Sequence, residues 1–180
     1  ELLKETVPTL AHLAAIADPS VQSSTLPAAV SNRAQVELAS QALGLPYTWY
    51  DVRNLDQLPS VLSTAVADGA DGLVVISGGV ILGGTDPRIG SAVLRSRLPG
   101  VGDNRLFAVN GGLLAHGVET LALARRSAFY VDRILRGAKP ADLPIELPTR
   151  FNIVINLRSA LELGITVPQS VLARATEVIQ

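Results

Sequence analysis

The sequence contains no cysteine, and aromatic residues make up only 4% of its 180 residues. The absence of cysteine excludes a disulfide framework, a thiolate zinc site and a cysteine nucleophile. It does not distinguish an oxidising compartment from a reducing one. Because aromatic residues are scarce, the core must be built mainly from small aliphatic side chains such as Ala, Leu and Val.

The sequence also lacks a large excess of either charge. Fifteen Lys and Arg residues stand against sixteen Asp and Glu residues, which gives a net charge of −1. No basic stripe is present, so nucleic acid is not an expected partner. No apolar run approaches the roughly 20 residues of a membrane span, and the opening "ELLKETVP" is typical of a charged helix end and not of a signal peptide. We therefore expect either a cytosolic protein or one whose export signal lies outside this chain.

The residues that are present describe a folding chain. Hydrophobic residues make up 48% of the sequence and charged residues 17%. A chain of this length and composition can bury one self-supporting core, with room for a short appendage.

Short apolar segments alternate with segments of helical periodicity. Strands are expected at residues 12–17, 46–52, 72–77, 99–102, 112–117 and 151–157. Helices are expected at 58–67, 88–98, 119–136 and 157–163, and in two further segments. The first of these begins at a possible N-cap, Thr25, ends at Gly44 and carries Leu26, Val30, Ala34, Leu38 and Ala42 on one face. The second begins at Pro168 and carries Leu172, Ala175 and Ile179 on one face. Such βα units in series predict an α/β fold with a doubly wound parallel sheet.

One segment fits neither pattern. Residues 137–148 contain Pro140, Pro144 and Pro148, which lack a backbone donor and force the preceding residues into extended conformations. The segment should therefore run as a stiff, solvated strap between two bodies.

Several segments resemble one protein family in the same order along the chain. These are "ELLKETVP", "ADGLVVIS", the run from Arg105 to Gly117, and "YVDRILRGAKPADLPIELPTRFNIVINLRSALELGITVPQSVLARATEVI". Together they resemble the ABC transporter substrate-binding protein family, and in particular relatives of the tryptophan/tyrosine-type binding proteins.

The resemblance implies an architecture and a function. Family members have two α/β lobes of the type I periplasmic-binding-protein kind, joined by crossing strands, with ligand in the cleft between them. This chain resembles the latter part, with the N-terminal lobe missing. Residues 1–118 would form the C-terminal ligand-binding lobe, and residues 119–180 a helix, strap and tail that pack on or return to the other lobe. The implied protein is periplasmic or otherwise extracytoplasmic, is not an enzyme, uses no cofactor, and has a small-molecule solute and an ABC permease as partners.

Ligands of open parallel sheets bind beyond the carboxyl ends of the strands. The loops expected there contain seven candidate ligand-binding residues: Asp18, Ser20, Ser77, Gly78, Asp103, Asn104 and His116. The loops depart from the family pattern, since Asp18-Pro19-Ser20-Val21 replaces the usual Asn-Pro-x-Asn and Gly78 follows Ser77 where Asp is common. The identity of the ligand therefore does not carry over, although a small solute such as an amino acid, bound by hinge closure, is the leading hypothesis.

Two other hypotheses stay open. The glycine-rich residues 78–84 could hold a phosphorylated ligand in an enzyme or effector-sensing domain, but they match neither a Walker loop nor a G-x-G-x-x-G motif. Ser77 lacks the first glycine of a nucleophile elbow, and no His or carboxylate cluster suggests a metal site. The third hypothesis is that apolar faces of the last helices drive formation of a homodimer.

Overall fold

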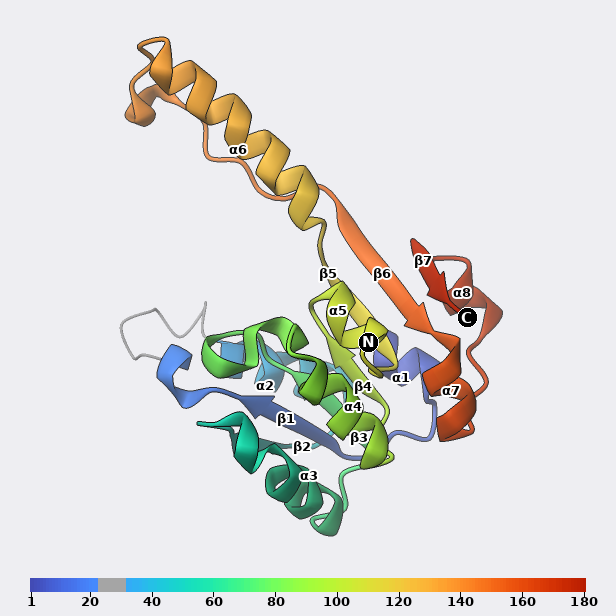
Figure 1. Cartoon of the computed structure of the whole chain (residues 1–180). Helices are drawn as coiled ribbons and strands as arrows, with labels where there is room; N and C mark the ends of the chain where they lie inside the picture. Colours follow the sequence, from blue (N-terminus) through green and yellow to red (C-terminus); the bar gives the residue numbers. More distant parts are fainter. Residues whose placement is uncertain (23–31) are drawn as a thin grey trace.

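The computed structural model describes residues 1–22 and 32–180 (Figure 1). Seven strands form one sheet in the order β2-β1-β3-β4-β5-β6-β7. They are β1 (Leu13–Ala17), β2 (Tyr47–Asp51), β3 (Gly72–Val75), β4 (Gly100–Gly102), β5 (Leu114–Val118), β6 (Phe151–Asn156) and β7 (Glu177–Ile179). Strands β1 to β5 are parallel, β6 runs antiparallel to β5, and β7 is parallel to β6. The expected α/β fold is confirmed, and its sheet is mostly parallel, with β6 as the antiparallel exception next to β5.

Helices cover both faces of this sheet. They are α1 (Leu2–Thr6), α2 (Asn32–Leu43), α3 (Leu58–Ala67), α4 (Pro87–Arg95), α5 (Arg105–Val109), α6 (Thr120–Leu135), α7 (Leu157–Leu163) and α8 (Gln169–Leu172). On one face, α3, α4 and α5 bury side chains such as Leu62, Ile89 and Phe107 against the strands. On the other face, α1, α7 and α8 contribute to a second apolar cluster with β5 and β6.

Local sequence signals explain where several helices begin and end. Asp86 caps α4 and Asn156 caps α7, each accepting a hydrogen bond from a backbone N–H of the first turn. Gly164 ends α7 in the left-handed conformation, at φ 73°. These signals make the predicted bounds of α7 correct to the residue.

Among the residues whose burial the structure describes, Phe107 is the largest fully buried side chain, and glycines surround it. A Cβ added at Gly112 would lie 2.2 Å from Phe107 Cε1, and one added at Gly102 would lie 2.8 Å from Phe107 Cγ. The absence of side chains at these positions lets the ring pack directly on the backbone of β4 and of the turn before β5.

Three expectations about helices need correction. The final helix is wrong: α8 ends at Leu172, and Ile179 lies instead in β7, paired with Asn156 of β6. Helix α5 was not expected. In α2 the expected buried face is wrong, since Leu38 is 57% exposed, while the expected positions Thr25, Leu26 and Val30 lie outside the described residues.

Helix α6 and the strap form an arm that projects from the sheet (Figure 1). The arm leaves at the end of β5 and returns at the start of β6, where the Glu119 N–H donates to the Arg150 carbonyl at 3.0 Å. No α6 residue is buried. Residues 151–180 rejoin the sheet through β6 and β7, so among residues 1–22 and 32–180 the arm, 119–150, is the part that stands outside the lobe. None of the helices described is long and apolar enough to cross a bilayer.

Candidate functional site

A pocket of about 570 Å³ opens beyond the carboxyl ends of β3, β4 and β5. Its lining residues are Ser77, Thr85, Asp103, Asn104, His116, Gly117, Val118, Thr120 and Phe151. Four of the seven candidate ligand-binding residues are thus brought together: Ser77, Asp103, Asn104 and His116. We call this hollow the strand-end pocket.

Asp103 carries the acidic group of the strand-end pocket. Packing of protein atoms around its carboxyl raises its pKa above the usual value, and a hydrogen bond from the Ser77 side chain opposes part of the shift. The residue as a whole is nevertheless exposed to solvent. Within residues 1–22 and 32–180, no cationic side chain forms an ion pair with Asp103. The pocket therefore contains a carboxyl group without a protein counter-charge.

The backbone at Asp103 is held by the strand that leads to the arm. A Cβ added at Gly117 of β5 would lie 1.7 Å from the Asp103 carbonyl oxygen. Only glycine permits this approach. The close contact fixes the loop after β4 against β5 and so sets where the Asp103 carboxyl lies.

Two rings also line the strand-end pocket. Residue pairs Val118↔Phe151 and His116↔Ile153 of β5 and β6 place His116 and Phe151 as diagonal neighbours on one face of the sheet. Their ring centroids are 6.1 Å apart, with an interplanar angle of 35°. Phe151 is 50% exposed, so its ring is available to a ligand.

Asn104 has a structural task as well. Its Oδ1 accepts a hydrogen bond of 2.9 Å from the Leu106 N–H and thereby caps α5. Its side chain remains part of the pocket lining, but the carbonyl oxygen already has one partner.

The remaining three candidates lie in two neighbouring loops that Asp18 joins. The buried Asp18 carboxylate accepts hydrogen bonds from the Ser20 N–H (2.8 Å) and, across loops, from the Val80 N–H (2.7 Å). The Val80 bond is the largest cause of a lowered pKa at Asp18. Gly78, at φ 143°, begins the turn that leads into the 3₁₀ helix η4 (Gly79–Gly84). Asp18 is therefore placed to fix the loop after β3.

Thr85 ends the loop expected after the strand at 72–77 but was not singled out, and Thr120 and Phe151 lie outside every loop that the sequence predicted for the pocket. Thr85 and Thr120 carry no sequence signal that separates them from other surface threonines. The first residue of the strand expected at 151–157 is Phe151, and only the antiparallel pairing of β5 with β6 brings it to the strand-end pocket.

A second, more apolar chamber of about 650 Å³ adjoins the strand-end pocket. It lies between the sheet and α1 and α2, and Ser77, Asp103 and His116 line both hollows. Val36, Ala39 and Leu43 of α2 face it, which corrects the expected orientation of that helix.

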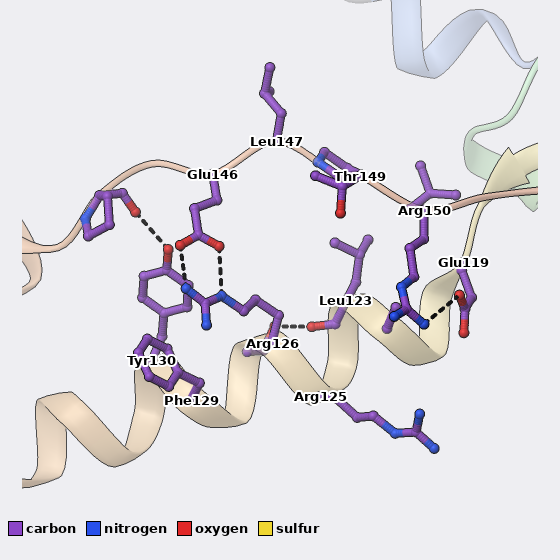
Figure 2. Close-up of a pocket in the computed structure, with 15 residues that line it drawn as sticks. Glu119, Leu123, Arg125, Arg126, Phe129, Tyr130, Glu146, Leu147, Thr149 and Arg150 are labelled. Atoms are coloured by element: carbon purple, nitrogen blue, oxygen red, sulfur yellow. Dashed lines mark hydrogen bonds and ion pairs between the residues drawn. The ribbon is translucent and has the colours of Figure 1, made fainter.

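A groove also runs along the arm between α6 and the strap (Figure 2). Arg126 binds both carboxylate oxygens of Glu146, and Tyr130 donates to the Pro144 carbonyl at 2.8 Å. Arg150 and Glu119 are paired at 3.9 Å where the arm meets the sheet. Figure 2 shows Arg125 and Leu147 pointing away from this groove. The strap is thus attached to α6 by side-chain hydrogen bonds and ion pairs and not by backbone strand pairing.

On the other side of α6 an apolar stripe faces solvent. Leu121, Ala124, Ala128, Val131 and Leu135 recur at the spacing of one helix face, and Leu135 is 81% exposed. In the part of the chain that the structure describes, no three His, Asp or Glu side chains gather as a metal site.

Comparisons with known proteins bear on the family and the fold of the chain. The sequence profile of the family described as "ABC transporter substrate binding protein" matches residues 1–179. A conserved domain protein from Vibrio cholerae superposes on 98% of this chain with a TM-score of 0.84 and 23% identity, and 57% of its own length is covered. The ABC domain from Streptococcus pneumoniae, solved in complex with L-Trp, superposes on 99% of the chain with a TM-score of 0.79 and 27% identity, and 59% of its length is covered.

A ligand-free, open substrate binding protein with adhesive properties from Clostridium difficile superposes on 99% of the chain with a TM-score of 0.68, at 18% identity and with 58% of its length covered. This chain therefore spans less than two thirds of the length of these solved relatives.

Proposed function

Because this chain belongs to the family of ABC transporter substrate-binding proteins, we propose that it supplies one lobe of a solute-binding protein of an ABC import system. The observation that carries the proposal is the strand-end pocket. It gathers a hydroxyl, a carboxyl, an amide and two rings at the sheet edge where ligands of parallel α/β sheets bind. The lobe orients the solute and performs no chemistry on it.

The proposed solute is an amino acid. Three features support it: the polar groups of the strand-end pocket, the exposed ring of Phe151, and the apolar chamber that adjoins them. The relative from S. pneumoniae, which is 27% identical over nearly the whole chain, was solved with L-Trp. Asp18, Ser20 and Gly78 contribute from the two loops beside the pocket.

The arm is proposed to meet a second lobe supplied by the rest of the natural protein. The apolar stripe on α6 supports this, because a solvated helix gains nothing from five apolar residues on one face. Closure of the two lobes about β5 and β6 would enclose the solute. The protein would act outside the cytoplasm and present the loaded, closed form to a membrane permease.

The glycine-rich loop gives little support to a phosphate site. The Asp18 carboxylate already accepts the Val80 N–H of this loop, and a phosphate at the same place would face a like charge. The alternative of an enzyme or effector-sensing domain therefore has no specific observation in its favour.

The proposal is tested with the protein in its natural length, purified from its own host. Native mass spectrometry should find a co-purified small solute, and a thermal-shift panel of amino acids, sugars, nucleotides and sugar phosphates should find compounds that raise the melting temperature. Amino acids are expected to stabilise the protein. A nucleotide or sugar phosphate as the bound molecule, or turnover of any compound added, would contradict the proposal.

A further inference from the structure

The strand-end pocket is asymmetric in charge. Its acidic group is Asp103, and neither Lys nor Arg is among its lining residues. The nearest basic residue along the chain, Arg105, is held by a bidentate pair with Glu177, with both N···O distances at 2.6 Å. A carboxylate that lacks a protein counter-charge attracts a cation from outside.

Near Asp103, the pocket has aromatic side chains that can contact the carbon atoms of an organic cation. The rings of His116 and Phe151 lie on the same face of the crossing strands. A protonated amine is stabilised by hydrogen bonds to a carboxylate and by the face of an aromatic ring. The apolar chamber shares Ser77, Asp103 and His116 with the pocket, so an apolar group attached to the amine has space beside it.

We propose that Asp103 is the residue that selects for a protonated amine on the solute, with the His116–Phe151 ring pair against the adjoining carbon atoms. This inference rests on the proposed function of the chain as a solute-binding lobe. It makes the bound class organic amines with an apolar substituent, amino acids included, and it disfavours solutes whose charged group is a carboxylate alone.

The free protein gives independent support. The raised pKa of Asp103 means that its ionised form is disfavoured in the folded state. For a group with this shift, stability falls as pH rises through the interval between the unfolded and the folded pKa. A carboxyl whose pKa is raised by surrounding protein atoms, and which forms no ion pair with the described cationic side chains, is typical of a ligand site.

The test uses the natural-length protein and three probes that share an indole: L-tryptophan, tryptamine and indole-3-propionate. Isothermal titration is run on the unsubstituted protein, on Asp103→Asn, and on Asp132→Asn, which changes the net charge equally on the arm. We expect Asp103→Asn to weaken binding of the two amines about 10- to 100-fold and to leave indole-3-propionate unchanged or bound more tightly. Asp132→Asn should change none of the affinities.

A second readout separates recognition from structural damage. Asp103→Asn should leave the melting temperature of the ligand-free protein unchanged or raised, because it removes an unpaired charge. An equal loss for all three probes, unchanged amine affinity in Asp103→Asn, or a solute found by the wider panel that has no amine would overturn the inference while the binding function stands. Failure of every compound in the wider panel to bind would overturn the proposed function, and the inference with it.

Discussion

The packing of Phe107 against the glycines predicts that one substitution, Gly112→Ala, changes the stability in opposite directions depending on whether the Phe107 ring is present. In Gly112→Ala the new methyl group would lie 2.2 Å from Phe107 Cε1, well inside contact distance. Phe107 is fully buried and has no room to move, so we expect Gly112→Ala to lower the free energy of unfolding by about 1–3 kcal/mol through overpacking.

The same methyl group is harmless when the ring is absent. Phe107→Ala alone should cost about 3–5 kcal/mol, because it removes a buried ring and leaves a cavity. In that background the methyl of Gly112→Ala occupies part of the cavity, and the backbone at Gly112 lies outside the positive-φ region. Gly112→Ala should therefore be neutral or stabilising by up to about 1 kcal/mol there, since it also restricts the unfolded chain.

Equilibrium unfolding in urea measures both effects. The single tryptophan, Trp49, lies in edge strand β2 and reports on the sheet by fluorescence, and circular dichroism provides a second probe. Phe129→Ala, in the exposed arm, is the matched control and should cost far less than Phe107→Ala. If Gly112→Ala has the same effect with and without the Phe107 ring, the two sites are additive and the packing argument is refuted.

Three further predictions follow from the same structure. Asn156→Ala should lower the free energy of unfolding by about 2–4 kcal/mol, because the Asn156 side chain accepts from the Ser159 N–H at the start of α7 (3.0 Å) and donates to the buried Ala108 carbonyl (2.7 Å). Asn54→Ala, at an exposed cap, is the control. Equal losses for the two variants in urea unfolding would show that the buried bond to Ala108 adds nothing. Asp18→Asn should lower stability at neutral pH. The pKa of Asp18 is lowered in the folded state, so the contribution of its carboxylate to stability is present above the unfolded pKa of about 3.9 and is lost as pH falls through the folded pKa. The difference in melting temperature between the unsubstituted protein and Asp18→Asn should therefore narrow from pH 5 to pH 2, and a constant difference would contradict this reasoning. Replacing residues 120–149 by Asn-Gly should leave the sheet folded, because a two-residue turn closes an antiparallel pair and Glu119 already bonds to Arg150; loss of cooperative unfolding would show that the arm is needed for folding.

Local signals explain what the sequence predicted well. Helix α7 was correct at both ends, because Asn156 and Gly164 act within one turn of chain. The six expected strands exist because their apolar runs are bounded by turn residues. The expectation that α6 and the strap pack on another lobe stays a prediction.

Pairing between distant segments explains what the sequence did not predict. Leu172, Ala175 and Ile179 have helical spacing, but the Thr176 N–H donates to Ile153 at 2.8 Å and Glu177 binds Arg105, which commits 177–179 to β7. The strand-end pocket was predicted in part, since the ends of parallel strands converge by topology. Phe151 was not, because its place depends on the register of an antiparallel pair.

The two-stranded connection to the arm has a mechanical consequence. From Gly117 onward β5 and β6 form a ribbon two strands wide, paired through Gly117↔Asn152 and Val118↔Phe151. A ribbon of this width resists bending in its own plane, where hydrogen bonds would have to stretch, and yields to bending across its thin dimension and to twisting. Backbone pairing would therefore set the stiff and the soft directions of this connection, and bending about an axis in the ribbon plane would be the easiest displacement of the arm. The ring of Phe151 stands on the ribbon itself, so any bending of the ribbon would move this ring relative to Asp103, which lies in the loop after β4.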